Sequence, residues 1–277
     1  MGTNDEALRY RAPFAEGDTA MVYDRRLRRY RVTLASGALI ETHLGYVRHD
    51  DVIGRREGFF LVTNKGSRLF VARPSFADAV KELPRQSQVI YPKDLAALLS
   101  HADIYPGARV IEIGLGSGAA SAALLRAVGP EGSLVTYEAR PEVVEPSRRN
   151  IAELAPGARN HRIITADAYT ESALGEDSEA DRVVADVPEP WRLLDAAAAA
   201  LRAGGVLASY LPTVLQAHEL VMRVSRDNQW CMPETVELLE RPWRFSETSA
   251  RPEHRMVGHT GFITTVRRTE PPPKDEE

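Results

Sequence analysis

The stretch Val110-Ile-Glu-Ile-Gly-Leu-Gly-Ser-Gly-Ala-Ala120 decides the fold of this chain. Its apolar beginning is typical of a buried strand, its three alternate glycines of a tight loop, and its alanine-rich end of a helix. Glycine lets a backbone turn sharply and approach a ligand without an intervening Cβ, and the next helix turns its free N–H groups toward that ligand. The stretch predicts a cradle for a nucleotide cofactor, although a plain strand-to-helix connection fits the same pattern.

Strand and helix patterns alternate regularly from this loop onward. We expect strands over 110–113, 134–138, 162–165, 182–185 and 206–211 and helices over 119–127, 142–154, 191–201 and 214–228, with Gly204-Gly205 ending the third helix. Two later strand-like runs, 234–240 and 261–268, can close the sheet as a hairpin with a long intervening loop. Such alternation produces right-handed crossovers, so we expect an α/β fold with a mainly parallel, doubly wound sheet.

The beginning of the chain has a different pattern. Short β-branched and aromatic runs separated by turn residues predict a small β domain over residues 1–76. A linker that starts with a short helix follows over 77–88, and the cofactor-binding domain occupies 89–269. Residues 270–277 are charged and rich in proline, which predicts a disordered tail.

Composition limits the classes of protein that this chain can be. With 277 residues and 43% hydrophobic content, it can bury a sizeable core. The single cysteine, Cys231, excludes an internal disulfide framework and any multi-cysteine metal site, and we expect no metal. No apolar stretch approaches the ~20 residues of a membrane span, and the first residues lack the order of a signal peptide. We therefore expect a cytoplasmic protein that does not bind membranes.

The formal net charge of −4 disfavours nucleic acid as a partner on average, but one segment is strongly basic. Arg25-Arg-Leu-Arg-Arg-Tyr-Arg31 holds five arginines and a tyrosine. Such a segment can hold an RNA backbone and stack a base, with Arg28 and Arg29 as central candidates, or it can be a solvated strand face.

Three acidic residues end successive predicted strands, where a doubly wound sheet binds its ligand. Glu138 ends the second strand, where a carboxylate can accept hydrogen bonds from both hydroxyls of a ribose; a solvated or capping glutamate is the alternative. Asp167 follows Ala166 after the third strand and can accept from an adenine amino group, or cap a helix. Asp186 follows the fourth strand, and the two prolines after it restrict its loop.

The glycine spacing bears on which cofactor binds. A dinucleotide fingerprint has its third glycine one residue later than Gly118, although it also allows the alanine found at position 119. S-adenosylmethionine carries no phosphate and needs only close backbone approach, acceptors for ribose and adenine, and room for its methionine end. A dehydrogenase that binds NAD therefore remains an alternative function.

Motifs along the whole chain resemble the tRNA adenine-N1 methyltransferases that modify adenine 58 in the T loop, particularly actinobacterial members. The matching segments are Gln88-Val-Ile-Tyr-Pro-Lys-Asp94, Glu112-Ile-Gly-Leu-Gly-Ser-Gly118, Tyr137-Glu138, Ala166-Asp167, Asp186-Val-Pro-Glu-Pro-Trp191, Gly204-Gly-Val-Leu-Ala-Ser-Tyr-Leu-Pro-Thr213 and Arg255-Met-Val-Gly-His-Thr-Gly-Phe262. One departure is Ala119-Ala-Ser121, where the family usually has alanine, a larger apolar residue and threonine.

This resemblance implies a class I, Rossmann-like methyltransferase domain with a seven-stranded sheet, S-adenosyl-L-methionine as cofactor, tRNA as partner and a homotetramer. It implies that Asp186 is catalytic and borders the cofactor, that Tyr91 lies near cofactor and target base, and that Tyr210 contributes to the substrate pocket. The residues that it implies hold the cofactor are Gly114, Gly116, Ser117, Gly118, Ala119, Ala120, Glu138, Ala166 and Asp167.

Two other functions share parts of this pattern. The glycine loop also resembles protein isoaspartate methyltransferases, but the β domain and the Asp186–Trp191 segment speak against that class. A non-catalytic tRNA-binding subunit of a methyltransferase complex would keep the fold without the chemistry, and the intact glycine loop together with Asp186 disfavours it.

Overall fold

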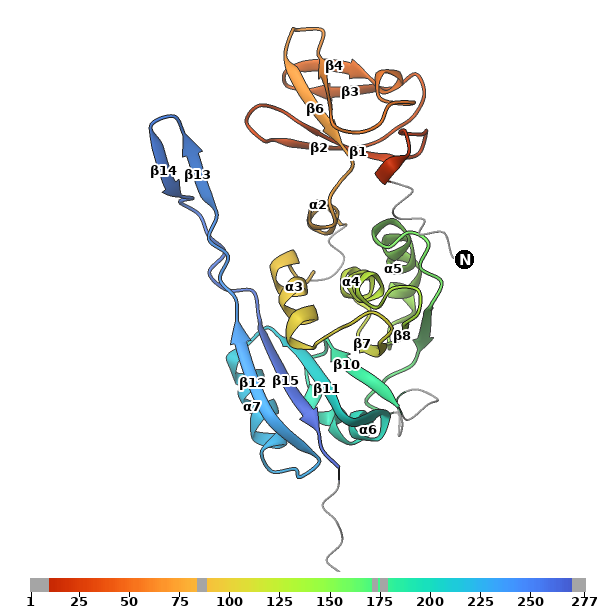
Figure 1. Cartoon of the computed structure of the whole chain (residues 1–277), viewed down its shortest axis with the longest axis vertical. Coiled ribbons are helices and arrows are strands. Elements are labelled where there is room, and N and C mark those ends of the chain that lie inside the picture. The colour runs from red at the N-terminus through yellow and green to blue at the C-terminus, as the bar shows by residue number, and fades with distance from the viewer. Residues whose placement is uncertain (1–9, 84–88, 171–173, 175–178, 271–277) are drawn as a thin grey trace, which may run out of the picture. The chain divides into compact units, whose positions relative to one another are not determined.

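The structure, a computed structural model, describes residues 10–83, 89–170, 174 and 179–270. The chain divides into two compact units, an N-terminal unit (Met1–Leu83) and a C-terminal unit (Pro84–Glu277), coloured red to orange and yellow to blue in Figure 1. Among the described residues, no helix is long and apolar enough to cross a membrane. The predicted tail lies almost entirely outside the described residues.

The N-terminal unit is built from antiparallel strands. Its main sheet has the order β2-β1-β6-β5, and β3 and β4 form a separate hairpin. The bounds are β1 (Thr19–Tyr23), β2 (Arg29–Thr33), β3 (Leu39–Thr42), β4 (Gly45–Arg48), the 3-10 turn η1 (His49–Asp51), β5 (Phe59–Val62), β6 (Arg68–Ala72) and helix α2 (Phe76–Lys81). Alternate residues such as Val22, Leu69 and Val71 point into one small core together with Phe14 and Ile40.

The C-terminal unit contains a seven-stranded sheet with the order β12-β15-β11-β10-β7-β8-β9. The pairs from β11 to β9 are parallel, and β15 pairs antiparallel with both β11 and β12. The strand bounds are β7 (Arg109–Ile113), β8 (Ser133–Glu138), β9 (His161–Thr165), β10 (Ala180–Ala185), β11 (Leu201–Leu211), β12 (Trp230–Glu237) and β15 (Phe262–Arg268). The predicted α/β class and mainly parallel sheet are confirmed.

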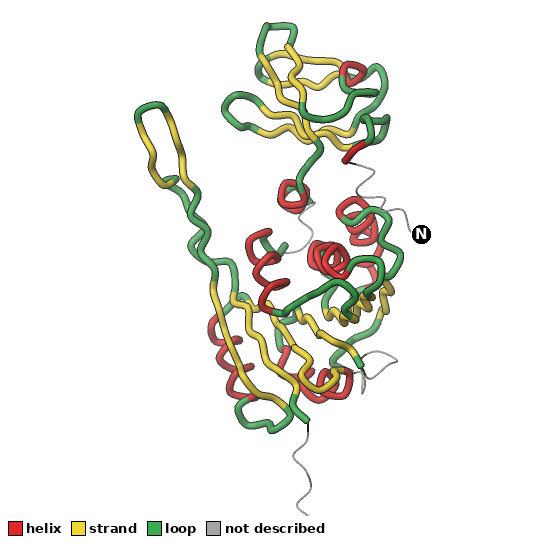
Figure 2. Tube along the Cα trace, viewed as in Figure 1, coloured by secondary structure: helices red, strands yellow, loops and turns green. Residues whose placement is uncertain are grey.

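Helices cover both faces of this sheet (Figure 2). On one face α3 contacts α4 and α4 contacts α5, while on the other the short turn η2 contacts both α6 and α7. The bounds are α3 (Pro92–His101), α4 (Ala119–Val128), α5 (Pro141–Leu154), η2 (Pro190–Leu193), α6 (Leu194–Ala200) and α7 (Val214–Val224). The parallel strands are accordingly buried on both sides, as their continuous apolar sequences require.

Two features differ from the sequence-based expectation. Gly204 and Gly205 do not end a helix but lie within β11, because α6 already ends at Ala200. A Cβ on Gly205 would lie 2.9 Å from the Arg202 carbonyl oxygen, so the strand has room there only for glycine. In addition, the loop expected between β12 and β15 contains a two-stranded hairpin, β13 (Trp243–Ser246) with β14 (Ser249–Pro252).

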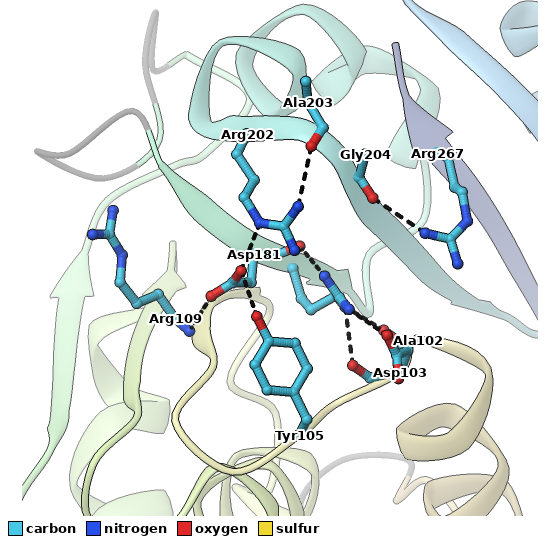
Figure 3. Close-up of polar contacts among 10 residues, drawn as sticks. Ala102, Asp103, Tyr105, Arg109, Asp181, Arg202, Ala203, Gly204 and Arg267 are labelled. Carbon is cyan, nitrogen blue, oxygen red and sulfur yellow. Dashed lines mark hydrogen bonds and ion pairs between the residues drawn. The ribbon is translucent and has the colours of Figure 1, made fainter.

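An ionic network joins four segments at the amino ends of the central strands (Figure 3). The Asp181 carboxylate accepts hydrogen bonds from the Tyr105 hydroxyl (2.6 Å), the Arg109 backbone N–H (2.9 Å) and the Arg202 Nε (2.7 Å). Next to it the buried Arg182 guanidinium donates to the carbonyl of Ala102 (2.7 Å). These contacts connect β7, β10, β11 and the segment after α3. They hold the strands in fixed positions at their amino ends, which also supports the carboxyl ends of the sheet.

We predict that Asp181→Ala lowers the free energy of unfolding of the C-terminal unit by about 2–3 kcal/mol, because it leaves three donors without their acceptor. All three tryptophans lie in this unit, so urea unfolding followed by tryptophan fluorescence reports on it. Glu131→Ala removes an exposed acid instead and should shift stability by less than about 0.5 kcal/mol. Equal unfolding curves for both variants would contradict the role given to the network.

Candidate active site

Strand register brings four of the predicted site residues to one edge of the sheet. Ile113 pairs with both Tyr137 and Ala185, and Ala185 pairs with Ser209. The residues that directly follow these four are Gly114, Glu138, Asp186 and Tyr210. Since the paired strands are parallel, these residues lie side by side at the carboxyl ends, where ligands bind in doubly wound sheets.

The glycine loop has a backbone that only glycine adopts readily. Gly114, Gly116 and Gly118 have positive φ angles of 93°, 50° and 80°. A Cβ on Gly114 would lie 2.5 Å from the carbonyl oxygen of Asp186, and one on Gly118 would lie 2.8 Å from Ile151. The glycines therefore allow the loop to pack directly against the end of β10 and against α5.

Glu138 fixes the conformation of this loop. Its buried carboxylate accepts hydrogen bonds from the backbone N–H groups of Leu115 (3.1 Å) and Gly116 (3.3 Å). Arg140 adds bonds from its backbone N–H and its Nε, both 3.0 Å long. Burial disfavours the charge on Glu138, but the bonds from Arg140 and Gly116 outweigh it and hold the pKa of the carboxyl below its usual range. The ribose acceptor predicted from the sequence is thus an ionised carboxylate that also shapes the loop.

Helix α5 holds the same loop from the other side. The Ser147 hydroxyl donates to the Gly116 carbonyl (2.6 Å), and the Asn150 side-chain amide donates to the Ser117 carbonyl (3.0 Å). Ala119 and Ala120 begin α4 and are buried. Loop N–H groups are thus engaged by β8 and loop carbonyls by α5, which leaves the loop little freedom.

Asp186 is a partly buried acid with an unusual environment. Its backbone N–H donates to the Ile113 carbonyl (2.9 Å), while its carboxylate makes no recorded hydrogen bond with any other described residue. Burial and the charge of Glu138 raise the pKa of Asp186 to about 6, against the opposing effect of Arg140. A carboxylate without an internal partner at a ligand-binding edge is available to bind a substrate donor.

Tyr210 is held in place by a buried polar cluster. Its hydroxyl donates to the Asp94 carboxylate (3.4 Å), and Lys93 Nζ lies 2.6 Å from the same carboxylate and 2.7 Å from the Thr260 hydroxyl. Burial and the charge of Asp94 raise the pKa of Tyr210, so its phenol stays protonated. Tyr91 is the N-cap residue of the helix that carries Lys93 and Asp94, and its side chain is 44% exposed.

Comparisons with known protein families show to which family the chain belongs. Residues 80–251 match a family model described as tRNA methyltransferase complex GCD14 subunit, and residues 13–61 match one described as TrmI-like N-terminal. The first match alone covers more than half of the sequence. The chain belongs to the GCD14/TrmI family of tRNA methyltransferases. The resemblance found in its motifs is thereby confirmed.

Individual members of the family match along most of this chain. A tRNA (adenine(58)-N(1))-methyltransferase TrmI of Thermus thermophilus is 33% identical over 250 residues, which cover 90% of this chain and 96% of that protein. A tRNA (adenine(57)-N(1)/adenine(58)-N(1))-methyltransferase TrmI of Methanocaldococcus jannaschii is 31% identical, covering 85% of this chain and 90% of its own length.

Solved structures share the fold. The tRNA (m1A58) methyltransferase TrmI of Aquifex aeolicus superposes with a TM-score of 0.83 at 26% identity, covering 94% of this chain and all of that one. A protein of Thermotoga maritima described as a SAM-dependent O-methyltransferase has a TM-score of 0.88 at 27% identity, covering 95% and 97%. The class I methyltransferase fold predicted from the family's motifs is confirmed.

Of the remaining predicted site residues, Asp167 follows β9 at the same edge of the sheet, because Thr165 pairs with Glu138, whereas Arg28 and Arg29 lie in the other unit. Asp167 is exposed, and its carboxylate accepts the backbone N–H of Tyr169 (3.0 Å), which fixes the turn after Ala166 and the end of β9. It caps no helix within the described residues. Arg28 and Arg29 belong to the N-terminal unit, where Arg29 forms an ion pair with Asp78 (2.6 Å). The two arginines thus have different surroundings, although they are adjacent in the sequence.

Sequence reasoning missed a buried acid beneath the glycine loop. Glu112 is 1% exposed and accepts hydrogen bonds on one oxygen from the hydroxyls of Ser121 (2.6 Å) and Thr136 (2.7 Å). Burial raises the pKa of Glu112 to about 8. The feature of the sequence that could have revealed Glu112 is a charged residue within an otherwise apolar strand. Ser121, at the position where the family usually has threonine, keeps the hydroxyl that Glu112 needs.

We predict that Glu112→Gln makes the C-terminal unit more stable than wild type as the pH rises. The wild-type carboxyl is neutral in the folded state up to about pH 8 but ionises above about pH 4.5 when unfolded. Between these two pH values the folded chain keeps a proton on Glu112 that the unfolded chain releases. The free energy of unfolding of the wild type therefore falls by up to about 1.4 kcal/mol per pH unit, and the variant lacks this pH dependence. Urea unfolding near both limits measures the difference, and parallel pH dependences would show that Glu112 is not perturbed.

Proposed function

We propose that this chain transfers a methyl group from S-adenosylmethionine to N1 of adenine 58 in the T loop of tRNA. The observation that carries the proposal is the 33% identity to an adenine-58 enzyme over 90% of the chain. The edge formed by Gly114, Glu138 and Asp186 supports it, because Glu138 provides an acidic acceptor and the Asp186 carboxylate has no recorded hydrogen bond with another described residue. We also propose that the chain acts in the cytoplasm, where a tRNA substrate is present.

The residues at this edge suit S-adenosylmethionine. A Cβ at Gly114 or Gly118 would collide with neighbouring protein atoms, so these glycines let the loop pack closely at the carboxyl ends of the strands, where doubly wound sheets bind ligands. We propose that Glu138 accepts from the ribose hydroxyls and that Ala166-Asp167, which follows β9 beside Glu138, binds the adenine. We propose that Gly114, Gly116, Ser117, Gly118, Ala119 and Ala120 hold the methionine end. When bound, the cofactor supplies an electrophilic methyl group.

Asp186 performs the central step in this proposal. Adenine N1 is an acceptor in a base pair, so its methylation requires an extruded base. The ionised Asp186 carboxylate accepts a hydrogen bond from the adenine N6 amino group, which orients N1 and stabilises the positive charge that develops on the ring. The Tyr210 hydroxyl, fixed by Asp94, and Tyr91 at the start of α3 border the base. Orientation of two reactants accounts for much of the acceleration.

Alternative functions receive less support from the site. A non-catalytic tRNA-binding subunit has no need of a free carboxylate at the end of β10, yet Asp186 is retained there with a raised pKa. The isoaspartate methyltransferase alternative does not account for the TrmI-like N-terminal match over residues 13–61. The resemblance to a protein described as an O-methyltransferase concerns the fold, since sequence relatives act on adenine N1.

We also propose that the chain forms a homotetramer. The β13–β14 hairpin supports self-association, because Trp243 and Phe245 are 54% and 74% exposed and stack on each other with ring centroids 6.5 Å apart. Large exposed aromatic side chains on a projecting hairpin are typical of a surface that another chain covers. Figure 1 shows this hairpin extending from the end of β12, well beyond the seven-stranded sheet of its own unit.

We predict that Asp186→Asn lowers kcat for methylation of unmodified tRNA by about 100-fold or more, because the amide can no longer accept from N6 with a full negative charge. Calorimetry with S-adenosylhomocysteine checks that the variant still binds the cofactor product, and NADH serves as the negative ligand. Turnover near the wild-type rate would exclude Asp186 as the catalytic acceptor.

The raised pKa of Asp186 predicts how activity depends on pH. The ionised carboxylate is the stronger acceptor for N6 and the only form that stabilises the developing positive charge with a full negative charge, so kcat/KM should fall as the pH drops through about 6 and reach a plateau above that value. The residual activity of Asp186→Asn should lack this step. A wild-type profile without an acid limb near pH 6, or the same limb in the variant, would argue against ionised Asp186 as the active form.

A further inference from the structure

Three hairpin turns enclose a hollow at one end of the β domain in the N-terminal unit. The turns are those between β1 and β2, between β3 and β4, and between β5 and β6. The hollow has a volume of about 500 Å³, and the residues that line it include Asp24, Arg25, Arg26, Arg28, His43 and Arg68. Four arginines and one acidic residue therefore line the hollow, in a chain whose formal net charge is −4.

Asp24, the acid that lines the hollow, bonds to the backbone of the arginine segment and does not form an ion pair with each arginine. The buried Asp24 carboxylate accepts hydrogen bonds on Oδ1 from the backbone N–H groups of Arg26 (2.7 Å) and Arg28 (2.9 Å). Leu27 lies between them with a φ of 60°, a strained value that the turn enforces. Asp24 thus fixes the loop backbone from which the arginine side chains project.

Four of the five arginines of the basic segment divide into two groups. Arg29 begins β2 and is neutralised by Asp78 of helix α2 at 2.6 Å. Arg28 faces the hollow, where its guanidinium lies 2.6 Å from Nε2 of His43. Arg25 and Arg26 line the hollow and are exposed, and their guanidinium groups have no recorded ion pair with another described residue. Of these four arginines, the three that line the hollow are therefore the ones that can bind an anion.

An exposed aromatic ring adjoins the hollow. The Arg68 guanidinium, which lines it, lies over the Phe60 ring at 4.2 Å from the centroid. Phe60 is 52% exposed, and its ring centroid is 5.3 Å from that of Phe70. Guanidinium groups beside an accessible aromatic ring suit single-stranded RNA, whose phosphates pair with arginine and whose bases stack on flat side chains. An acidic peptide would use the charges but not the ring.

We propose that this hollow binds phosphate groups of the tRNA backbone, with Arg25, Arg26, Arg28 and Arg68 as the phosphate ligands and Phe60 as a stacking surface for a neighbouring base. The proposal rests on the proposed function, because it takes tRNA as the substrate. It assigns Arg28 to the RNA site and Arg29 to the packing of α2, whereas the sequence makes both arginines candidates for RNA binding.

The test compares two charge-matched double variants of the full chain. Arg25→Ala/Arg26→Ala removes two cations from the hollow, and Arg11→Ala/Arg56→Ala removes two exposed cations of the same unit that do not line it. Binding of unmodified tRNA is measured by fluorescence anisotropy across a salt series. The hollow variant should bind about tenfold or more weakly, with a slope of log Kd against log salt that is shallower by about 1–2. The control should stay near wild type, and equal thermal midpoints verify folding.

The outcomes separate the two proposals. Equal affinities and slopes for both double variants overturn the RNA site while leaving the proposed function intact, provided that wild type methylates tRNA. A selective loss in the hollow variant supports the site even if wild type leaves tRNA unmethylated, a result that contradicts the proposed function alone. Poly-glutamate that binds wild type as tightly as tRNA, with the same selective loss, assigns the hollow to acidic peptides and overturns the RNA assignment.

Discussion

The hydrogen bonds between the Glu138 carboxylate and the N–H groups of Leu115 and Gly116 are the constraint on which the rest of the site depends. They connect the end of β8 to the loop after β7, and the hydroxyl of Ser147 secures the same loop from α5. The loop can then approach the end of β10 so closely that Gly114 has no room for a Cβ beside Asp186. One buried acid, which is itself the proposed ribose acceptor, therefore positions the glycines beside the proposed catalytic group.

Three acids near this loop have three different protonation behaviours, and their surroundings explain each of them. Glu138 is stabilised as an anion by Arg140 and backbone donors, Glu112 is kept protonated at neutral pH by burial, and Asp186 has a pKa of about 6. Environment commonly separates neighbouring carboxyls in this way at catalytic sites. Burying these carboxylates lowers the stability of the folded chain. The negative charge that remains would favour the binding of a cationic sulfonium ligand.

The sequence predicted the parallel sheet, the glycine loop and the strand-end acids because each leaves a local pattern. Apolar runs mark buried strands, and register then places Glu138 and Asp186 at one edge without further information. Other features depend on contacts between distant residues. The sequence could not show that Asp78 neutralises Arg29, nor that Gly204 lies in a strand. Glu112 was detectable as a charge inside an apolar strand, but its hydroxyl partners come from elsewhere in the fold.

The central claim is that this edge methylates N1 of adenine 58, and the most direct measurement is to map the methylated position. The full chain is incubated with labelled S-adenosylmethionine and a tRNA transcript, and with a second transcript in which guanine replaces adenine 58. The account predicts one N1-methyladenine at position 58 in the first transcript and no label in the second. Label at another nucleotide or on the protein itself, or no label in either transcript, would contradict it.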